Sequence, residues 1–354
     1  MASEGLKIYK QKKSKRTVWI GIFIIVILTI SIFSLSINTF GMSMEQAFNI
    51  LIDHLMGVQP TNRMEEVMDK VVMDLTAPRT IAGILVGIIL AIDGAIMQSL
   101  TRNSLAEPYT IGISAAAMFG TSLSIALGIH IMPSFGNEIG RTFNAFIFAL
   151  IPAFVIVFIS SFKKMSGNMM ILIGIGMMYL FTASTTFIKF NAAGDALHEI
   201  FEWSIGTLSR TTWSTILPLV IASIISFASF MLLANKINVL SAGDNMSKSL
   251  GVDPVRLRIL CFIIVSLTTA IAVSYTGTIG FVGLVGPHIA RLFVGSDSKV
   301  LIPFSAIIGA IMIIGADCMV RLLPGGLPCG VMTAMIGSPV FIYILYKQRK
   351  RAAF

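Results

Sequence analysis

The ionisable residues best placed for chemistry stand inside apolar segments. Asp93 interrupts one such segment, and His288 and Arg291 follow Pro287 in the stretch GTIGFVGLVGPHIARLFVG at 277–295. Ionisable groups at membrane depth usually face a cavity or a partner, and a carboxylate at the midplane can couple transport to an ion. Asp93 is therefore a candidate coupling residue, whereas a lone histidine such as His288 is more often structural than catalytic.

Sequence motifs of the common catalytic and metal sites are absent. The chain has no G-x-x-x-x-G-K-[ST] and no Gly-Lys pair, so we expect no phosphate loop. HEIFE at 198–202 does not complete H-E-x-x-H, and no G-x-S-x-G occurs. The cysteines, Cys261, Cys318 and Cys329, form no C-x-x-C pair. The sequence predicts a chain that is not an enzyme and holds neither a metal nor a cofactor.

The elements that must position these residues are membrane helices. The 354 residues are 55% hydrophobic and only 12% charged, whereas a soluble chain is about 25% charged. Apolar runs of about 20 residues recur, which is enough to span the hydrocarbon core. The predicted fold is all-α, a polytopic membrane protein.

Ten spans are expected, at about 17–37, 78–100, 108–128, 142–162, 168–190, 213–234, 258–276, 279–294, 301–321 and 327–346. They form a single ten-helix transmembrane domain over 17–346, between basic cytoplasmic tails at 1–16 and 347–354. Most of the 26 Lys and Arg residues fall in alternate loops and in the tails, which places both termini in the cytoplasm. Topology thus explains the net charge of +9, and no nucleic-acid partner is expected.

Two polar segments predict short helices outside the lipid. SMEQAFNILIDHLM at 43–56 begins with Ser43 as a helix N-cap, and ALHEIFEW at 196–203 fits a helix at the outer surface. Trp203 and Trp213 suit the membrane interface.

Small residues are frequent in the predicted spans. Gly83, Gly87 and Gly94 share one span, and Gly174 and Gly176 share another. Such residues allow tight helix packing, but a polar path through the bundle is equally compatible with them. Asp93 favours the path.

The inside segment SAGDNMSKSLGV at 241–252 predicts a short helix ended by a glycine. It could be a surface on which a separate motor subunit acts, or a solvated loop. Composition alone leaves both open.

Five stretches in register form a recognisable set: APRTIAGILVGIILAIDGAIMQSLTRNSLAEPYTIGIS at 77–114, SAGDNMSKSLGV, GTIGFVGLVGPHIARLFVGSD at 277–297, GADCMVRLL, and LPCGVMTAMIGSPVFIYIL. Together they resemble the FecCD family of iron-siderophore, haem and cobalamin permeases. The resemblance implies ten helices, both ends inside, and a homodimer around a central path in a bacterial or archaeal cytoplasmic membrane. It also implies two ATPase subunits, which bind the ATP, and an extracytoplasmic substrate-binding protein. The substrate would be a ferric siderophore, haem or cobalamin, moved by alternating access.

The resemblance also assigns roles to residues. Arg79 and Arg321 would dock the binding protein. ATPase coupling would fall to Ser241, Asp244, Ser249, Leu250 and Gly251. Ser166 and Asn168, in the turn KKMSGN at 163–168, would form the cytoplasmic gate. Structural roles near helix ends are expected for Gln98, Asn103, Pro108, Pro287, His288, Arg291 and Asp317.

This sequence departs from the family pattern at several positions. Asp93 and Gly286 replace the usual small and aliphatic residues, Ser104 replaces a proline, Gly326 replaces an acid, and Thr76 replaces an arginine. An ion-coupled secondary transporter that uses Asp93 is therefore retained as the alternative function.

Overall fold

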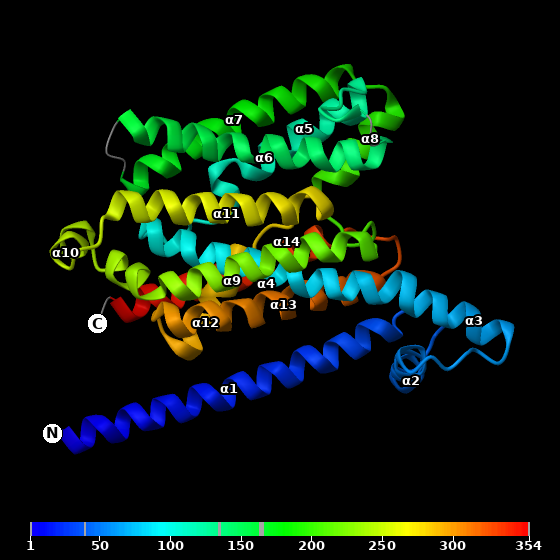
Figure 1. Ribbon diagram of the computed structural model, residues 1–354, viewed down its shortest axis with the longest axis horizontal. Coiled ribbons are helices and arrows are strands. Elements are labelled where there is room, and N and C mark those ends of the chain that lie inside the picture. Colours follow the sequence, from blue (N-terminus) through cyan, green and yellow to red (C-terminus); the bar gives the residue numbers. More distant parts are fainter. Residues whose placement is uncertain (1, 39, 134–135, 163–165, 353–354) are drawn as a thin grey trace.

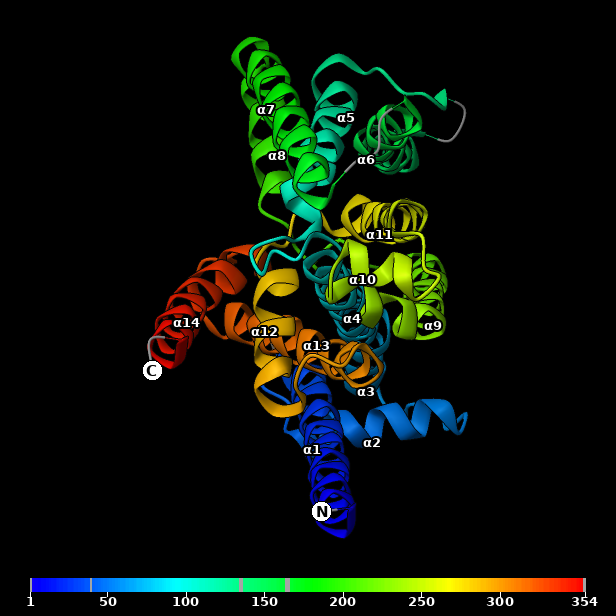
Figure 2. The same ribbon diagram turned by 90° about the vertical axis from the view of Figure 1, so that its left-hand side faces the viewer.

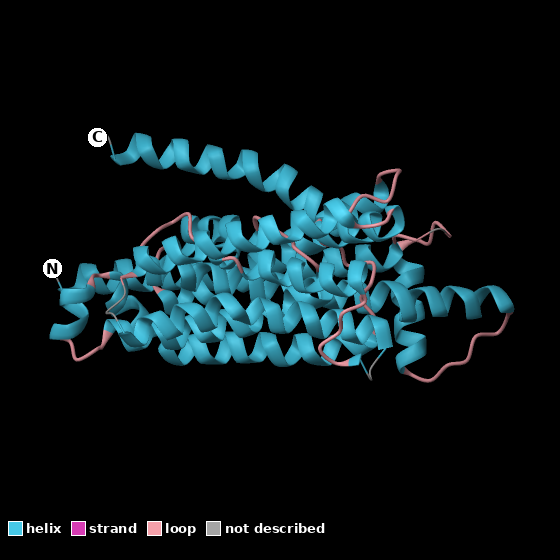
Figure 3. Ribbon diagram, turned by 90° about the horizontal axis from the view of Figure 1, so that it is seen from above, coloured by secondary structure: helices cyan, strands magenta, loops and turns pink. Residues whose placement is uncertain are grey.

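The computed structural model describes residues 2–38, 40–133, 136–162 and 166–352, and no strand occurs among them (Figure 3). The elements are α1 Ala2–Ser36, α2 Met44–Leu55, α3 Arg63–Lys70, the π-helix η1 Val71–Thr76, α4 Ala77–Thr101, the 3-10 turn η2 Pro108–Ile111, α5 Ile113–Leu127, α6 Gly136–Phe162, α7 Gly167–Asn191, α8 Gly194–Ser204, α9 Trp213–Ser241, α10 Asp244–Ser249, α11 Pro254–Thr276, α12 Val282–Val294, α13 Ser298–Leu322 and α14 Cys329–Ala352.

The predicted spans are confirmed as helices. Within the described residues, seven segments are long and apolar enough to cross a membrane, and α5, α12 and part of α14 are shorter apolar helices. The span expected from 108 begins instead with η2, and its helix starts at Ile113. The helix of the first span extends back through most of the basic tail expected at 1–16. Residues 1, 353 and 354 of the two tails lie outside the described residues.

Helix α4 forms the centre of the bundle. It packs against α9, α11, α12 and α13 (Figure 2), and most of its residues are buried. Two backbone contacts fix its neighbours: a Cβ on Gly87 would lie 2.4 Å from the Gly309 carbonyl oxygen of α13, and one on Gly94 would lie 1.9 Å from the Gly283 carbonyl oxygen of α12. The close-packing interpretation of these two glycines is therefore confirmed.

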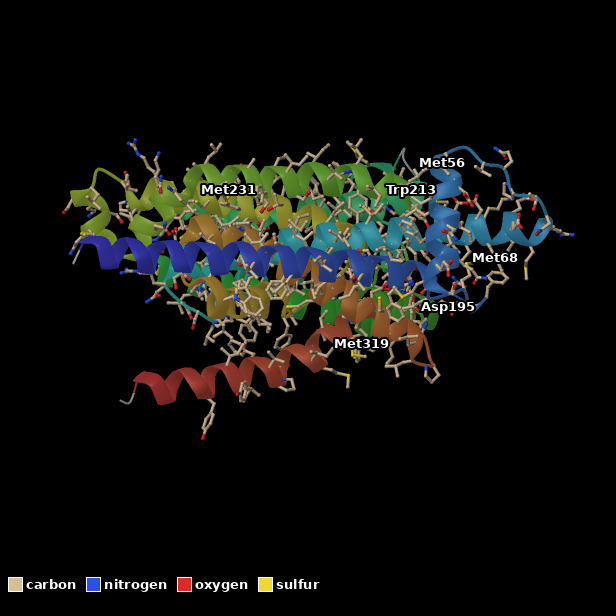
Figure 4. All side chains as sticks on the ribbon, turned by 90° about the horizontal axis from the view of Figure 1, so that it is seen from below. Met56, Met68, Asp195, Trp213, Met231 and Met319 are labelled. Carbon is tan, nitrogen blue, oxygen red and sulfur yellow. The ribbon has the colours of Figure 1, made fainter. Side chains whose placement is uncertain are left out.

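The short helices divide between the two ends of the bundle. Helix α10 lies at the end that carries both chain termini, and α2, α3 and α8 lie at the other end (Figure 1). Met56, Met68, Asp195 and Trp213 mark this second end (Figure 4). The predicted N-cap of α2 is confirmed, because Ser43 and Gln46 form a reciprocal capping box.

Candidate functional site

The glycine-rich stretch before α12 is an irregular segment buried in protein. Gly277 has φ +70°, and a Cβ there would lie 2.4 Å from the Trp203 carbonyl oxygen. The Ile279 N–H donates to the Tyr109 hydroxyl at 3.0 Å, and the Thr278 hydroxyl donates to the Ser204 carbonyl. Non-helical backbone is tolerated at membrane depth where protein groups satisfy it in this way.

Pro287 leaves a carbonyl of α12 without its helical donor, because proline has no N–H to offer the carbonyl four residues before it. That carbonyl belongs to Gly283. The Gln98 side chain of α4 donates Nε2–H to it at 3.3 Å, and also to the Leu284 carbonyl at 3.3 Å. Arg291 in turn donates to Gln98 Oε1. The structure thus brings three of the predicted helix-end residues into one network between α4 and α12.

His288 is 1% exposed and has a structural environment. Its Nδ1 lies 2.7 Å from the Leu284 carbonyl oxygen, so Nδ1 carries the proton. The ring packs edge-on to Phe341 of α14, with centroids 5.3 Å apart. These contacts position α12 against α14.

Asp93 is fully buried between α4, α9 and α11. Ser226 of α9 lies 2.8 Å from Oδ1, and Thr268 and Thr269 of α11 lie 2.7 and 2.8 Å from Oδ2. The residue interpreted as favouring a polar path is thus surrounded by hydroxyl groups of the bundle interior.

Asp317 joins the two arginines predicted to dock a partner. Arg79 donates through Nε and Nη2 at 2.7–3.0 Å, and the Nε of Arg321, four residues after Asp317 on α13, lies 3.0 Å from its carboxylate. The partner of Arg79 thus lies on α13, far along the chain. Arg321 also donates to the Ser34 carbonyl of α1 at 2.9 Å.

The three side chains of this cluster are largely withdrawn from solvent: Arg79 is 20% exposed, Arg321 11% and Asp317 2%. The cluster contains one carboxylate and two guanidinium groups, so one positive charge is not balanced. The cluster ties α1, α4 and α13 together. Docking by these arginines stays a prediction.

Helix α10 is anchored to the bundle by a carboxylate. Asp244 accepts from Arg258 at 2.6 and 2.9 Å and from Arg102 at 3.3 Å, and Arg258, itself 1% exposed, donates to the Leu100 carbonyl at 3.0 Å. Hydrogen bonding from Arg258 lowers the pKa of Asp244 below its ordinary value. Sequence reasoning missed Arg258, although an arginine at the start of a span was a signal for such an anchor.

The outer side of α10 remains open. Met246 is 53% and Leu250 57% exposed. Gly251 ends the helix with φ +75° and open space around its Cβ position. The Ser241 and Ser249 hydroxyls donate to carbonyls of their own turns. Of the predicted coupling residues, Leu250 therefore presents an apolar surface, and Asp244 holds the helix in place.

A cavity of about 700 Å³ lies beside α10. Its lining includes Ser166 together with Asp244, Lys248 and Asp253. Ser166 is the N-cap of α7 and accepts from the Met169 N–H at 3.3 Å. The structure thus places the predicted gate serine next to the predicted coupling helix. Asn168 is exposed, and residues 163–165 of the gate turn lie outside the described residues.

The remaining predicted residues occupy turns. The Asn103 side chain accepts from the Leu105 N–H at 2.9 Å, and Pro108 begins η2. Gly326 has φ +62° and no atom within 4 Å of a Cβ position, a conformation that suits glycine better than the family's acid. No group of three or more His, Cys, Asp or Glu side chains that could hold a metal occurs among the described residues.

The fold and these contacts are those of a membrane transport subunit, and the chain belongs to the FecCD transport family, whose model matches residues 23–347. An ABC transporter permease of Methanocaldococcus jannaschii is 35% identical over 97% of this chain and 98% of its own. The iron(3+)-hydroxamate import permease FhuB of Bacillus subtilis is 34% identical over 82% of this chain and 74% of its own.

A solved structure agrees with this assignment. A metal-chelate type ABC transporter in an inward-facing conformation superposes with a TM-score of 0.80 at 26% identity, covering 94% of this chain and 99% of its own. The protein is a multi-pass permease subunit of an ABC importer, a transport component of a system that works with ATPase and binding-protein partners. The secondary-transporter alternative is not favoured.

Proposed function

We propose that this chain moves a metal chelate inward across a bacterial or archaeal cytoplasmic membrane. The candidate substrates are a ferric siderophore, haem and cobalamin. The transport activities named for the B. subtilis relative and for the solved neighbour support a metal-chelate substrate. ATP is bound and hydrolysed by separate ATPase subunits, and a separate binding protein delivers the chelate.

The observation that carries the proposal is the placement of α10. This helix interrupts the chain between α9 and α11, and Asp244 fixes it to Arg258 at the start of α11. Met246 and Leu250 leave an apolar surface on its open side. A force applied there by an ATPase would pass into two long helices that both pack on α4. That is the connection alternating access requires.

The proposed homodimer would form around the side of the bundle that carries α7 and α14. Both helices lie on the same side of α4 (Figure 2), and both carry large exposed apolar side chains, among them Leu172, Tyr179, Met335 and Ile336. Two copies facing each other here would enclose a central path.

Ser166, at the start of α7, would lie near the inner end of that path. Cysteines placed at 166 are expected to cross-link the two subunits in one nucleotide state only. Equal cross-linking in both states would contradict the gate.

Docking of the binding protein is proposed at the end of the bundle opposite α10. Arg79 and Arg321 lie there with one unbalanced positive charge, so charge reversal at either is expected to slow association, and less so at high salt. Arg63, exposed on α3 at the same end, provides a matched charge-reversal control. If Arg79→Glu and Arg321→Glu bind the partner as the wild type does, the docking assignment is wrong.

The decisive experiment is uptake by proteoliposomes that contain the permease and its ATPase, with the binding protein added. Ferric hydroxamate, haem and cobalamin are compared as substrates. We expect one of them to be imported only with ATP. Leu250→Asp should abolish substrate-stimulated ATP hydrolysis, whereas Leu55→Asp, a substitution of a 70% exposed residue of α2 at the opposite end, should not. Uptake driven by an ion gradient without ATP would refute the proposal.

A further inference from the structure

The contacts of Asp93 require more hydrogen atoms than its neighbours can supply. Four oxygen–oxygen distances in this group are 2.8 Å or shorter: Ser226 to Oδ1, Thr268 and Thr269 to Oδ2, and Thr268 to the Ile264 carbonyl. Each distance is that of a hydrogen bond between oxygen atoms. A two-centre bond at so short a distance needs its own proton between its two oxygens.

The three hydroxyl groups supply only three protons. Ser226 and Thr269 each have Asp93 as acceptor, and each can use its proton there. Thr268 faces two acceptors with one proton. If it donates to the Ile264 carbonyl, as helical threonines commonly do toward the residue four before, nothing lies between its oxygen and Asp93 Oδ2. A proton on Oδ2 completes the set, since Asp93 then donates to Thr268.

No opposite charge replaces that proton. None of the ion pairs found in the described residues includes Asp93. The charged ends of the packed helices are engaged elsewhere: Arg258 of α11 binds Asp244 and the Leu100 carbonyl, and Arg291 of α12 binds Gln98. Arg102, directly after the end of α4, lies nine residues beyond Asp93, about 13 Å along the axis. On α12, the Nδ1–H of His288 is directed to a backbone carbonyl.

The ends of the other two packed helices are equally remote. On α13, Asp317 and Arg321 belong to the cluster with Arg79. On α9, Lys236 lies ten residues beyond Ser226, about 15 Å along the axis. An isolated carboxylate in such a site would be very costly.

We infer that Asp93 is a buried proton-binding site, and that the neutral acid joins α4 to α9 and α11 through Ser226, Thr268 and Thr269. Because α9 and α11 flank α10, this junction links the central helix to both helices on which α10 is mounted. The protonation itself is a property of the folded chain and does not depend on the proposed substrate or partners.

The test compares two buried aspartates in the purified full-length protein. Asparagine copies the shape and the donor of a neutral acid but its NH2 group cannot accept from Thr269, so Asp93→Asn is expected to lower the midpoint of thermal unfolding by at most about 4 °C. Asp317→Asn is the matched control. Asp317 pairs with two arginines, so its substitution should lower the midpoint by roughly 6 °C or more. Infrared spectroscopy at neutral pH should show the C=O stretch of a protonated carboxyl group in the wild type that is missing in Asp93→Asn.

Three results would overturn the inference. The first is a wild-type spectrum that lacks this band. The second is an Asp93→Asn protein that is as unstable as Asp317→Asn or fails to fold. The third is an unfolding midpoint that rises when sodium chloride replaces choline chloride and loses this response in Asp93→Asn, because a bound cation would then occupy the place of the proton.

Discussion

Replacement of Gly94 by alanine tests whether backbone contact between α4 and α12 holds the bundle together. The added Cβ would lie 1.9 Å from the Gly283 carbonyl oxygen, 2.5 Å from its carbon and 2.6 Å from its Cα. All three atoms are backbone, so no side chain can turn away. An ordinary carbon–oxygen contact is about 3.3 Å, which means that the two helices must separate by roughly 1.4 Å.

That separation also affects the bonds from Gln98 to α12. Both are already 3.3 Å long, and an increase of this size would break them. Overpacking costs about 1–3 kcal/mol, and each lost hydrogen bond about 0.5–1.5 kcal/mol. The expected loss is therefore roughly 2–6 kcal/mol, which corresponds to a fall of at least about 4 °C in the unfolding midpoint.

Thermal unfolding of the purified protein measures this loss, with Gly315→Ala as the control. Gly315 lies within α13 and has no atom within 4 Å of a Cβ position, so alanine there should be neutral or slightly stabilising. If Gly94→Ala unfolds within about 1 °C of the wild type, the close contact does not support the bundle and the packing argument fails.

Three further outcomes are expected. Gln98→Leu should destabilise the protein by about 1–3 kcal/mol. The loss should be smaller in a Pro287→Ala background, because the backbone N–H regained at position 287 would bond the Gly283 carbonyl. Strictly additive changes in the free energy of unfolding would count against this network. Gly251→Val should reduce substrate-stimulated ATP hydrolysis while Gly251→Asn retains most of it, because asparagine adopts positive φ more readily; equal rates in both would exclude backbone strain as the cause. Since the pKa of Asp244 is lowered in the folded state, its pairing stabilises the protein above the unfolded pKa of about 3.9, and this stabilisation is lost as the pH falls from there through the lower, folded pKa. The difference in unfolding midpoint between wild type and Asp244→Asn should therefore be constant from pH 7 to 5 and shrink below about pH 4. A pH-independent difference would contradict the pairing.

The spans were predictable because each depends on a local property, a long run of apolar residues. The N-cap of α2 and the short helix α10 were predictable for the same reason, since Ser43 and Gly251 act within a few residues of themselves. The helix bounds differ from the expectation mainly at 108–112, where η2 and the positive φ of Gly112 delay the start of α5.

The pairings across the bundle could not be predicted, because nothing local identifies them. Arg79 and Asp317 are 238 positions apart, and Gln98 and Gly283 are 185 apart. Asp93 stands out in the sequence because it is charged, but nothing in the sequence distinguishes its three hydroxyl partners on α9 and α11 from other serines and threonines. The sequence indicated which residues were unusual, and the packing decided what each one contacts.

The shortness of α12 has a consequence for how the protein enters the membrane. Its 13 residues extend only about 20 Å, less than the roughly 30 Å of the hydrocarbon core. The irregular backbone before it finds its partners at Tyr109 and Ser204, which the ribosome makes earlier. Helix α12 is therefore a poor substrate for independent insertion. Its integration is expected to wait until the preceding helices have assembled to receive it.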